Sequence, residues 1–225
     1  MIVAALQPGY LPWVGFFDLM RRSDLFVIAD NLKYTKQDWR SRNRIRTAEG
    51  FCYVSVPVKR HAKYGPINEA DIDNTRPWRQ RNFNLLKEHY RKAPFWSTYE
   101  PFLRETFDMT WTRLIDVDMW FIEFLAREFS ISGPTALLSE FPVKFGADKT
   151  QSLIELTRAV GADTFLEGSA GRNFVDVAMF EAAGLRIAFQ DYVCRPYRQQ
   201  FEPFMSHLSA IDLLLNEGPA GSELI

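Results

Sequence analysis

The chain has 225 residues, of which 47% are hydrophobic and 24% are charged, and its formal net charge at pH 7 is −1. This composition is typical of a globular protein and excludes the disordered, collagen-like and coiled-coil classes. A net charge this close to zero also excludes an overall electrostatic field that would attract nucleic acid or an anionic membrane. The length fits one elaborated domain, so we expect residues 1–225 to form a single domain.

The cysteines and the amino-terminal sequence indicate the cellular compartment. Cys52 and Cys194 lie far apart without His or Cys at metal-ligand spacing, so the sequence predicts neither a disulfide framework nor a metal site. Residues 1–6 lack the basic segment of a signal peptide, and the apolar run 117–125 is too short to span a membrane. We therefore expect a cytoplasmic protein that does not bind membranes.

The first thirty residues predict a βαβ unit. Ile2–Leu6 is a short apolar run that ends at Gln7, which is typical of a strand buried on both faces. Apolar residues then recur near helical spacing, and Leu25–Ala29 is a second run of the same kind that ends at Asp30. Because open α/β sheets bind ligands beyond the carboxyl ends of their strands, the sequence predicts a ligand site directly after both runs.

Residues 33–46 hold the one strong concentration of charge, with six cations and one anion. Arg40, Arg42, Arg44 and Arg46 alternate with period two, so an extended backbone would place all four guanidinium groups on one side. Guanidinium groups bind phosphate oxygens in bidentate geometry, which favours a diphosphate site. The alternative is a solvated edge strand whose charges prevent aggregation.

The middle of the chain predicts one more strand, over Phe51–Val58, and then a helical insertion at about residues 77–130. Pro77–Ala93 is a polar-rich helix candidate, and Leu114–Phe129 is apolar around most of its circumference, so we expect the second helix to be deeply packed. His89 is the histidine best placed to serve as a general base if the chemistry needs one. The alternative for His89 is a partly buried packing role.

The last part of the chain predicts a second βαβ unit. Asp148 resembles the cap of a helix over Lys149–Val160. Thr164–Leu166 and Leu185–Phe189 are short apolar runs typical of buried strands, and Phe174–Ala183 between them is a helix candidate. Together the two units predict an α/β fold, in which a mostly parallel sheet built from βαβ units is flanked by helices.

A small-residue loop at positions 168–171 follows the first of these two strands, and Arg172 and Asn173 come directly after it. Backbone N–H groups at the start of the next helix can bind an anion there, with Arg172 adding charge. The same residues are also typical of a tight turn in which Asn173 caps the helix, so both interpretations stay open. Polar and aromatic residues after the last strand, Gln190 and Tyr192 among them, can converge on the same cleft.

Four stretches of the sequence resemble the WbqC-like family, and they span nearly the whole chain. They are residues 7–17 (QPGYLPWVGFF), 34–45 (YTKQDWRSRNRI), 189–192 (FQDY) and 208–218 (LSAIDLLLNEG). The family is associated with bacterial surface-polysaccharide gene clusters, where its proposed task is to attach glycine or another small acyl group to an amino sugar. The resemblance therefore implies an acyl- or aminoacyltransferase of glycyl type that forms an amide on the amino group of a nucleotide-linked amino-deoxy sugar in O-antigen biosynthesis.

The resemblance also implies an activated acyl donor, either an aminoacyl-tRNA or an ATP-derived adenylate, and no tightly bound cofactor. Two positions depart from the pattern of the family. Relatives tend to have paired acids where this chain has Asp30 and Asn31, and His-Pro where it has Arg195 and Pro196. The proton of the amine must then pass to another group, and Asp30 and His89 are the candidate catalytic residues.

Residues of the loops and of the arginine-rich segment are the candidate substrate-binding residues. They are Gln7, Tyr10, Trp13, Tyr34, Lys36, Asp38, Trp39, Arg40, Arg42, Asn43, Arg44, Ser169, Arg172, Asn173, Gln190 and Tyr192. We expect the arginines to hold the diphosphate and Trp39 or Tyr10 to stack on the base or sugar. The alternative function is a non-catalytic module that binds single-stranded RNA or a nucleotide through residues 36–46.

Overall fold

The computed structural model describes residues 1–60 and 65–225, and the backbone contacts divide the chain into two compact units. Unit 1 comprises Met1–Gln7, Gly15–Leu32 and Ile131–Val193, and unit 2 comprises Pro8–Val14, Lys33–Ser130 and Cys194–Ile225. The expectation of a single domain over the whole chain stays a prediction, and each unit is described by itself.

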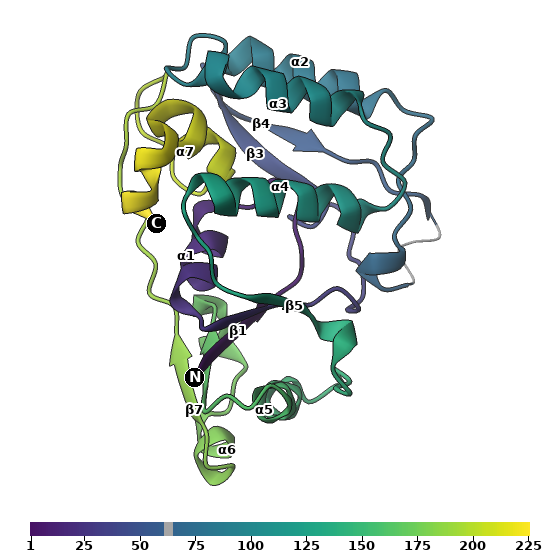
Figure 1. The fold of residues 1–225 in the computed structure, drawn as a ribbon, viewed down its shortest axis with the longest axis vertical. Helices are drawn as coiled ribbons and strands as arrows, with labels where there is room; N and C mark the ends of the chain where they lie inside the picture. The colour runs from purple at the N-terminus through teal and green to yellow at the C-terminus, as the bar shows by residue number, and fades with distance from the viewer. Residues whose placement is uncertain (61–64) are drawn as a thin grey trace. The chain divides into compact units, whose positions relative to one another are not determined.

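Unit 1 is built on a five-stranded parallel sheet with the strand order β5-β2-β1-β6-β7 (Figure 1). The strands are β1 (Ile2–Leu6), β2 (Leu25–Ile28), β5 (Thr135–Leu137), β6 (Thr164–Glu167) and β7 (Arg186–Phe189). The four apolar runs that predict parallel strands are thus confirmed as strands of one sheet, and the predicted α/β fold is confirmed with them. The edge strand β5 was not predicted, because three residues are too few to show a strand pattern.

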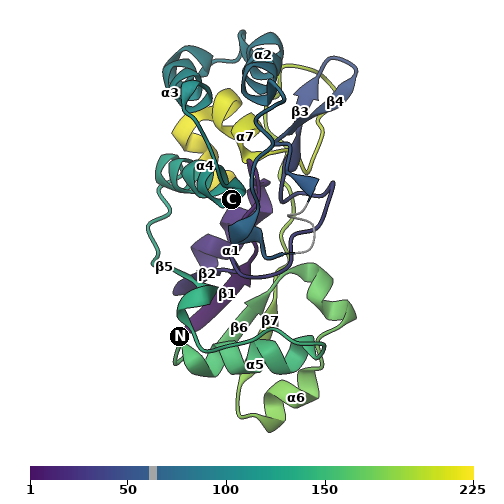
Figure 2. The same ribbon diagram turned by 90° about the vertical axis from the view of Figure 1, so that its right-hand side faces the viewer.

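Helices cover both faces of this sheet (Figure 2). They are α1 (Val14–Arg22), α5 (Lys149–Ala159) and α6 (Val177–Ala182). On one face, Phe16 of α1 packs edge-to-face on Phe26 of β2, with ring centroids 5.1 Å apart. On the other face, Val27 and Phe165 join the same buried core as Leu153 of α5 and Phe180 of α6. Both faces of the strands are therefore buried, which explains why the strands are apolar at successive positions rather than at alternate ones.

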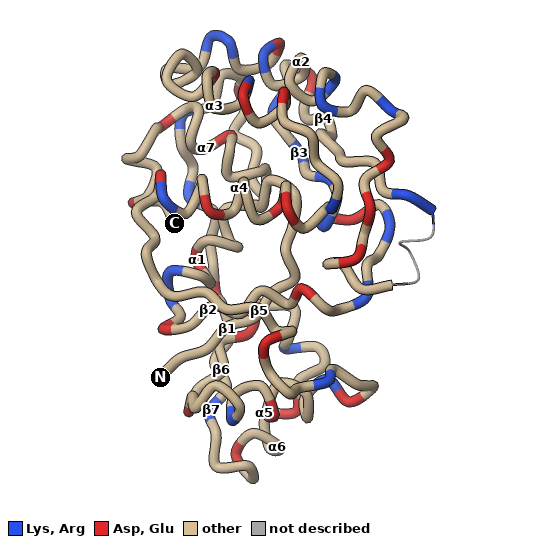
Figure 3. The backbone as a smooth tube through the Cα atoms, turned by 45° about the vertical axis from the view of Figure 1, so that its right-hand side comes forward, with Lys and Arg blue, Asp and Glu red and all other residues tan. Residues whose placement is uncertain are grey.

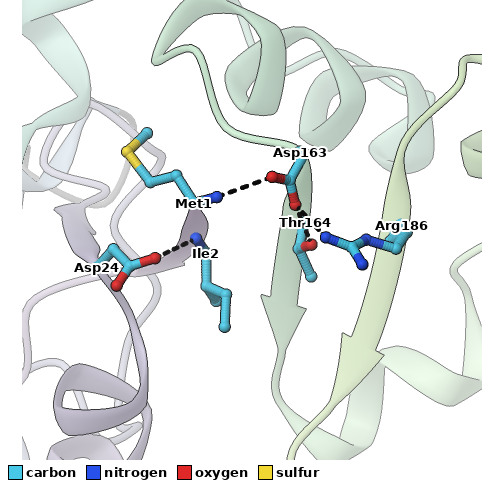
Figure 4. Close-up of polar contacts among 6 residues, drawn as sticks. All are labelled: Met1, Ile2, Asp24, Asp163, Thr164 and Arg186. Atoms are coloured by element: carbon cyan, nitrogen blue, oxygen red, sulfur yellow. Dashed lines mark hydrogen bonds and ion pairs between the residues drawn. The ribbon is translucent and has the colours of Figure 1, made fainter.

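The amino-terminal edge of the sheet is fastened by charged contacts (Figure 4). The amino group of Met1 donates to Asp163 Oδ2 at 2.8 Å, and Arg186 donates to Asp163 Oδ1 at 2.6 Å. These donors, together with the Thr164 hydroxyl, hold the pKa of the Asp163 carboxyl well below its usual range. The Ile2 backbone N–H donates to Asp24 at 2.7 Å. These contacts join the starts of β1, β6 and β7 at this edge.

Unit 2 combines an antiparallel hairpin with helices. Its elements are β3 (Arg42–Thr47), β4 (Gly50–Ser55), α2 (Trp78–Tyr90), α3 (Trp96–Asp108), α4 (Leu114–Glu128), α7 (Ala210–Glu217) and the 3-10 helices η2 (Ile67–Glu69) and η5 (Gly218–Leu224). The predicted helical middle of the chain is confirmed, and so is the deep packing of α4, whose Val117, Phe121 and Leu125 have no exposed surface. No helix in residues 1–60 and 65–225 is long and apolar enough to cross a membrane.

The sequence did not predict α3, because Pro101 lies inside it. A proline in a helix interior lacks the N–H that would bind the preceding turn, so it normally marks a break. In α3 this loss is offset by burial, since Trp96, Tyr99 and Leu103 are all packed in the interior of unit 2. Tertiary packing overrides local preference here.

Asp212 of α7 is the buried charge around which unit 2 is organised. Its carboxylate accepts hydrogen bonds from the Tyr90 hydroxyl at 2.6 Å, the Tyr197 hydroxyl at 2.6 Å and the Gln199 amide at 3.0 Å. The Tyr90 oxygen in turn accepts from the backbone N–H of Arg46 in β3 at 2.8 Å. Burial raises the pKa of Asp212, and the three donors oppose that shift. The contacts join α2, β3, α7 and the segment before α7.

Replacing Asp212 with Ala should lower the free energy of unfolding by about 3–5 kcal/mol, because three buried donors lose their acceptor. Tyr197→Phe removes one of these hydrogen bonds and should lower it by about 1–2 kcal/mol. Urea denaturation followed by circular dichroism measures both effects. Asp116→Ala is the matched control, since Asp116 lies exposed on α4. If Asp212→Ala and Asp116→Ala are equally stable, Asp212 does not organise unit 2.

Candidate active site

The carboxyl ends of the strands in unit 1 form the edge at which doubly wound sheets bind ligands. The strand order reverses between β1 and β6, and ligands of such folds bind outside the strand ends at this reversal. Gln7 follows β1 and Glu167 ends β6, so these two residues flank the reversal. Asp30 follows β2 and Gln190 follows β7 at the same edge. The predicted convergence of Gln7, Asp30 and Gln190 on one sheet edge is therefore what the parallel topology produces.

Glu167 is the most perturbed carboxyl group at this edge, and the sequence analysis missed it. Burial raises its pKa to about 7, while the Gly168 backbone N–H and the charge of Lys149 partly oppose the shift. That N–H donates to Glu167 Oε1 at 3.1 Å. A carboxyl with a pKa near 7 exchanges protons at neutral pH, which is what a general base requires. The sequence contains one signal that could have identified Glu167, because it is a single acidic residue at the end of an apolar strand run.

Gly171 sets the position of the Glu167 side chain. A Cβ atom at Gly171 would lie 2.1 Å from Glu167 Cγ. Because Cγ is close to the backbone, moving the outer atoms of the Glu167 side chain cannot relieve this contact. The Gly171 backbone N–H donates to the Gly168 carbonyl at 2.8 Å, and this bond closes the turn. The glycine is therefore needed for close approach to the carboxyl side chain.

The other polar groups at this edge are engaged with neighbouring elements. Asp30 is only 2% exposed, and its Oδ1 accepts from the Ser139 backbone N–H at 2.9 Å. The Gln190 amide donates to the Gly15 carbonyl at 2.8 Å and to Asp18 at 2.6 Å, which fastens the start of α1. Gln7 is buried directly after β1. These contacts fix the shape of the edge, and Asp30 is much less accessible than a substrate-facing base should be.

The loop after β6 differs from its prediction. Residues Ser169–Asn173 form a short 3-10 helix, and α6 begins only at Val177, because Asp176 caps it by accepting from the backbone N–H groups of Ala178 and Met179. The predicted helix start at residue 174 and the Asn173 cap are therefore wrong, and a helix N-terminus does not directly follow the strand. Arg172 instead pairs with Asp191 at 2.7 Å, while Ser169 and Asn173 are exposed. Tyr192 follows half-buried.

In unit 2, the loop after β1 is part of the interior. Tyr10 has no exposed surface, packs edge-to-face on Phe121 and accepts a hydrogen bond from Asn82 at 3.0 Å. The predicted stacking of Tyr10 on a ligand is therefore corrected, because its ring is a core group. Trp39 is 37% exposed and lies against Gly9, where a Cβ would come within 2.6 Å of the indole. Stacking of Trp39 on a ligand stays a prediction.

The four alternating arginines have different environments. Arg40 precedes β3 in a turn and pairs with Asp38 and Thr35, so the predicted extended backbone does not include it. Arg46 is buried and donates to four backbone carbonyls, those of Thr47, Gly50, Phe201 and Pro203. Arg42 stacks on Tyr53 at 4.3 Å, and Arg44 stacks on Phe51 at 5.1 Å while donating to the His207 carbonyl. Among these four arginines, phosphate binding therefore stays a prediction for Arg42 and Arg44.

The remaining predicted binding residues of unit 2 have mostly structural contacts. Asn43 donates to the Leu11 carbonyl at 2.8 Å, the Tyr34 hydroxyl bonds Ser41 Oγ at 3.0 Å, and Trp13 stacks on His207 at 5.4 Å. Lys36 is exposed. His89 is half-buried in the last turn of α2 and lines a cavity of unit 2. Within residues 1–60 and 65–225, no three or more His, Cys, Asp or Glu side chains are grouped to hold a metal ion.

Fold and site together define a doubly wound α/β protein in which a carboxyl group of raised pKa, that of Glu167, lies at the carboxyl edge of the sheet. A model of the WbqC-like protein family matches residues 7–223, and the chain belongs to this family. The chain is also 31% identical over 219 residues to "Uncharacterized protein Rv1507c" of Mycobacterium tuberculosis (strain ATCC 25618 / H37Rv), covering 96% of this chain and 94% of that protein. No solved structure matches the chain.

The raised pKa of Glu167 predicts a pH-dependent stability. Above pH 4.5 the unfolded chain releases this proton while the folded chain keeps it, so the free energy of unfolding should fall between pH 4.5 and about 7 and then level off. Replacing Glu167 with Gln should remove this loss, which amounts to at most about 3 kcal/mol. Urea denaturation at pH 5 and pH 8 measures the difference. Exposed Glu181 on α6 provides the control Glu181→Gln. Parallel pH curves for wild type and Glu167→Gln would contradict the prediction.

Proposed function

We propose that this protein is a cytoplasmic acyl- or aminoacyltransferase of glycyl type, which forms an amide on the amino group of a nucleotide-linked amino-deoxy sugar in bacterial O-antigen biosynthesis. The single observation that carries the proposal is Glu167, a carboxyl group with a pKa of about 7 where the strand order reverses. Membership of the WbqC-like protein family supports the substrate class.

Glu167 has the properties that the amide-forming step needs. The amine nitrogen forms a bond to the acyl carbon, the bond from that carbon to the nucleotide or tRNA oxygen breaks, and the nitrogen gives its proton to the Glu167 carboxylate. The leaving oxygen departs with the electron pair of the broken bond. A base with a pKa near the working pH is the most effective in such a transfer. Glu167 therefore replaces Asp30 and His89 as the catalytic base in this proposal.

The β3–β4 hairpin of unit 2 has groups suited to a phosphate. Arg42 and Arg44 are half-buried on one face of β3, where Tyr53 and Phe51 of β4 support their guanidinium planes. In the described part of the chain, neither arginine pairs with a carboxylate. Neither guanidinium charge is compensated by such a pair, so both can bind a phosphate in this proposal. Trp39, which is close in the sequence, has an exposed ring.

A specific observation also favours a second candidate, a module that binds single-stranded RNA. Arg40 on Trp39, Arg42 on Tyr53 and Arg44 on Phe51 form a series of stacked arginine and aromatic pairs. Such pairs bind successive bases and phosphates without catalysis. Along the described backbone of both units, however, Lys and Arg are interspersed with Asp and Glu (Figure 3). The net charge of −1 is also not typical of a protein that binds RNA through a broad basic surface.

Loss of the Glu167 carboxyl should abolish amide formation. Glu167→Gln should lower the rate by about 10²–10⁴-fold, and the wild-type rate should rise with pH through about 7 as the carboxylate forms. Nucleotide-linked 4-amino-6-deoxy sugars are incubated with glycine and ATP, or with glycyl-tRNA, and mass spectrometry detects the glycyl amide. Glu181→Gln is the control. If wild type forms no amide with any pair of substrates, or if Glu167→Gln forms it at the wild-type rate, the proposal fails.

Arg42→Ala should weaken binding of the nucleotide sugar by about 1.5–3 kcal/mol with little change in melting temperature. Arg42→Lys should restore only part, because an ammonium group cannot form the bidentate contact. Isothermal titration calorimetry at two salt concentrations measures the effect, and added salt should weaken wild type more than the variant. The RNA-binding candidate predicts instead that Arg42→Ala weakens binding of a single-stranded RNA and leaves nucleotide-sugar binding unchanged.

A further inference from the structure

Unit 2 contains a cavity of about 430 Å³ that the proposed function does not use. Its lining residues come from the end of α2 and the residues after it, from the segment 198–201 and from Asn216 of α7. A volume of this size is in the range of small-molecule sites. The residues that line it indicate the class of ligand.

The charged groups of the cavity favour an anion. Arg91, Lys92 and Arg198 line it, against the single acidic side chain of Glu88. In the part of the chain that the structure describes, none of the three cations forms an ion pair. Their charges are therefore not neutralised by the protein, and an anion in the cavity would gain contacts without displacing an internal partner.

The floor of the cavity is polar and rigid. Gln199 and Asn216 are only 7% and 5% exposed. The Gln199 amide donates to Asp212 at 3.0 Å and to the Met205 carbonyl at 2.9 Å, and the Asn216 amide donates to the Asp212 carbonyl at 2.8 Å. Through these contacts, Asp212 fixes two lining residues of the cavity as well as the elements of unit 2. Walls held in this way need little reorganisation on binding.

One wall of the cavity is aromatic. Phe201 lines it and is half-buried, and the guanidinium of the buried Arg46 lies 5.9 Å from the centre of its ring. The Arg46 guanidinium also donates to the Phe201 carbonyl at 3.1 Å, which holds this residue in place. An aromatic ring beside unpaired cations matches a ligand that has both a flat base and a phosphate.

We propose that this cavity binds a nucleoside phosphate, with the phosphates on Arg91, Lys92 and Arg198 and the base on Phe201. The lining of this cavity does not include Glu167 of unit 1 or Arg42 and Arg44 of the hairpin. Its residues come from the end of α2, from the segment before α7 and from Asn216 of α7, and they include His89, the histidine that the sequence favoured as a general base.

Isothermal titration of the full chain with ADP tests the proposal. Arg198→Ala and Arg91→Ala should each weaken ADP binding about tenfold or more, and Glu88→Gln should tighten it, because the only acidic charge of the lining is removed. Lys87→Ala, an exposed change on α2 outside the cavity, is the matched control and should leave this binding unchanged. Circular dichroism confirms that each variant is folded.

Two further probes identify the ligand class. Inorganic pyrophosphate should bind more weakly than ADP, because it has no base to stack on Phe201, and ADP should shift the ring resonances of Phe201 and His89 in NMR spectra. The proposal is overturned if ADP does not bind, if Arg91→Ala and Arg198→Ala bind it like wild type, or if pyrophosphate binds equally well. A competition experiment with labelled ADP tests whether the ligand is a small molecule. If a 12-nucleotide single-stranded RNA displaces labelled ADP at a lower concentration than unlabelled ADP does, the small-molecule assignment is overturned. Loss of amide formation in Glu167→Gln bears only on unit 1.

Discussion

The hydrogen-bonded carboxylate of Asp212 is the interaction on which unit 2 depends. A buried carboxylate is costly unless donors compensate it, and Tyr90, Tyr197 and Gln199 are the three donors. Because these donors come from α2 and from the segment before α7, satisfying the charge fixes where those segments lie. The β3 strand follows through the contact from Arg46 to Tyr90. The hairpin and the cationic cavity are consequently both placed by one buried charge.

Burial also decides which acidic groups can exchange protons. Asp118 on α4 is fully buried, and within the described residues its two carboxyl oxygens have no hydrogen-bond partner, so burial raises its pKa far above the usual range. Burial without a hydrogen-bond donor favours the neutral form of such a group. Glu167 is less deeply buried, and the Gly168 N–H and Lys149 limit its shift to a pKa of about 7. A pKa of about 7 makes the protonation of Glu167 sensitive to pH near neutrality.

The alternating arginines show how one residue type serves several purposes. Arg46 donates to backbone carbonyls in the interior, and Arg40 stabilises a turn through Asp38. Arg42 and Arg44 stack on aromatic rings across the hairpin and are only half-buried. Period-two spacing correctly predicted a shared strand face for the last three, since β3 covers them. The spacing could not predict how much of each side chain is buried, because that depends on segments distant in the sequence.

Local sequence patterns predicted four of the five strands of unit 1, because strands such as Ile2–Leu6, buried on both faces, must be apolar at every position. Local patterns also predicted α4 and the cap of α5 at Asp148, because the apolar character of a helix and its capping residue are both read from neighbouring positions. The tertiary structure alone decided α3, which is stable despite Pro101, and the interior position of Tyr10. It also decided the raised pKa of Glu167, because a pKa of about 7 arises from the desolvation of a strand end by surrounding segments, which no local pattern records.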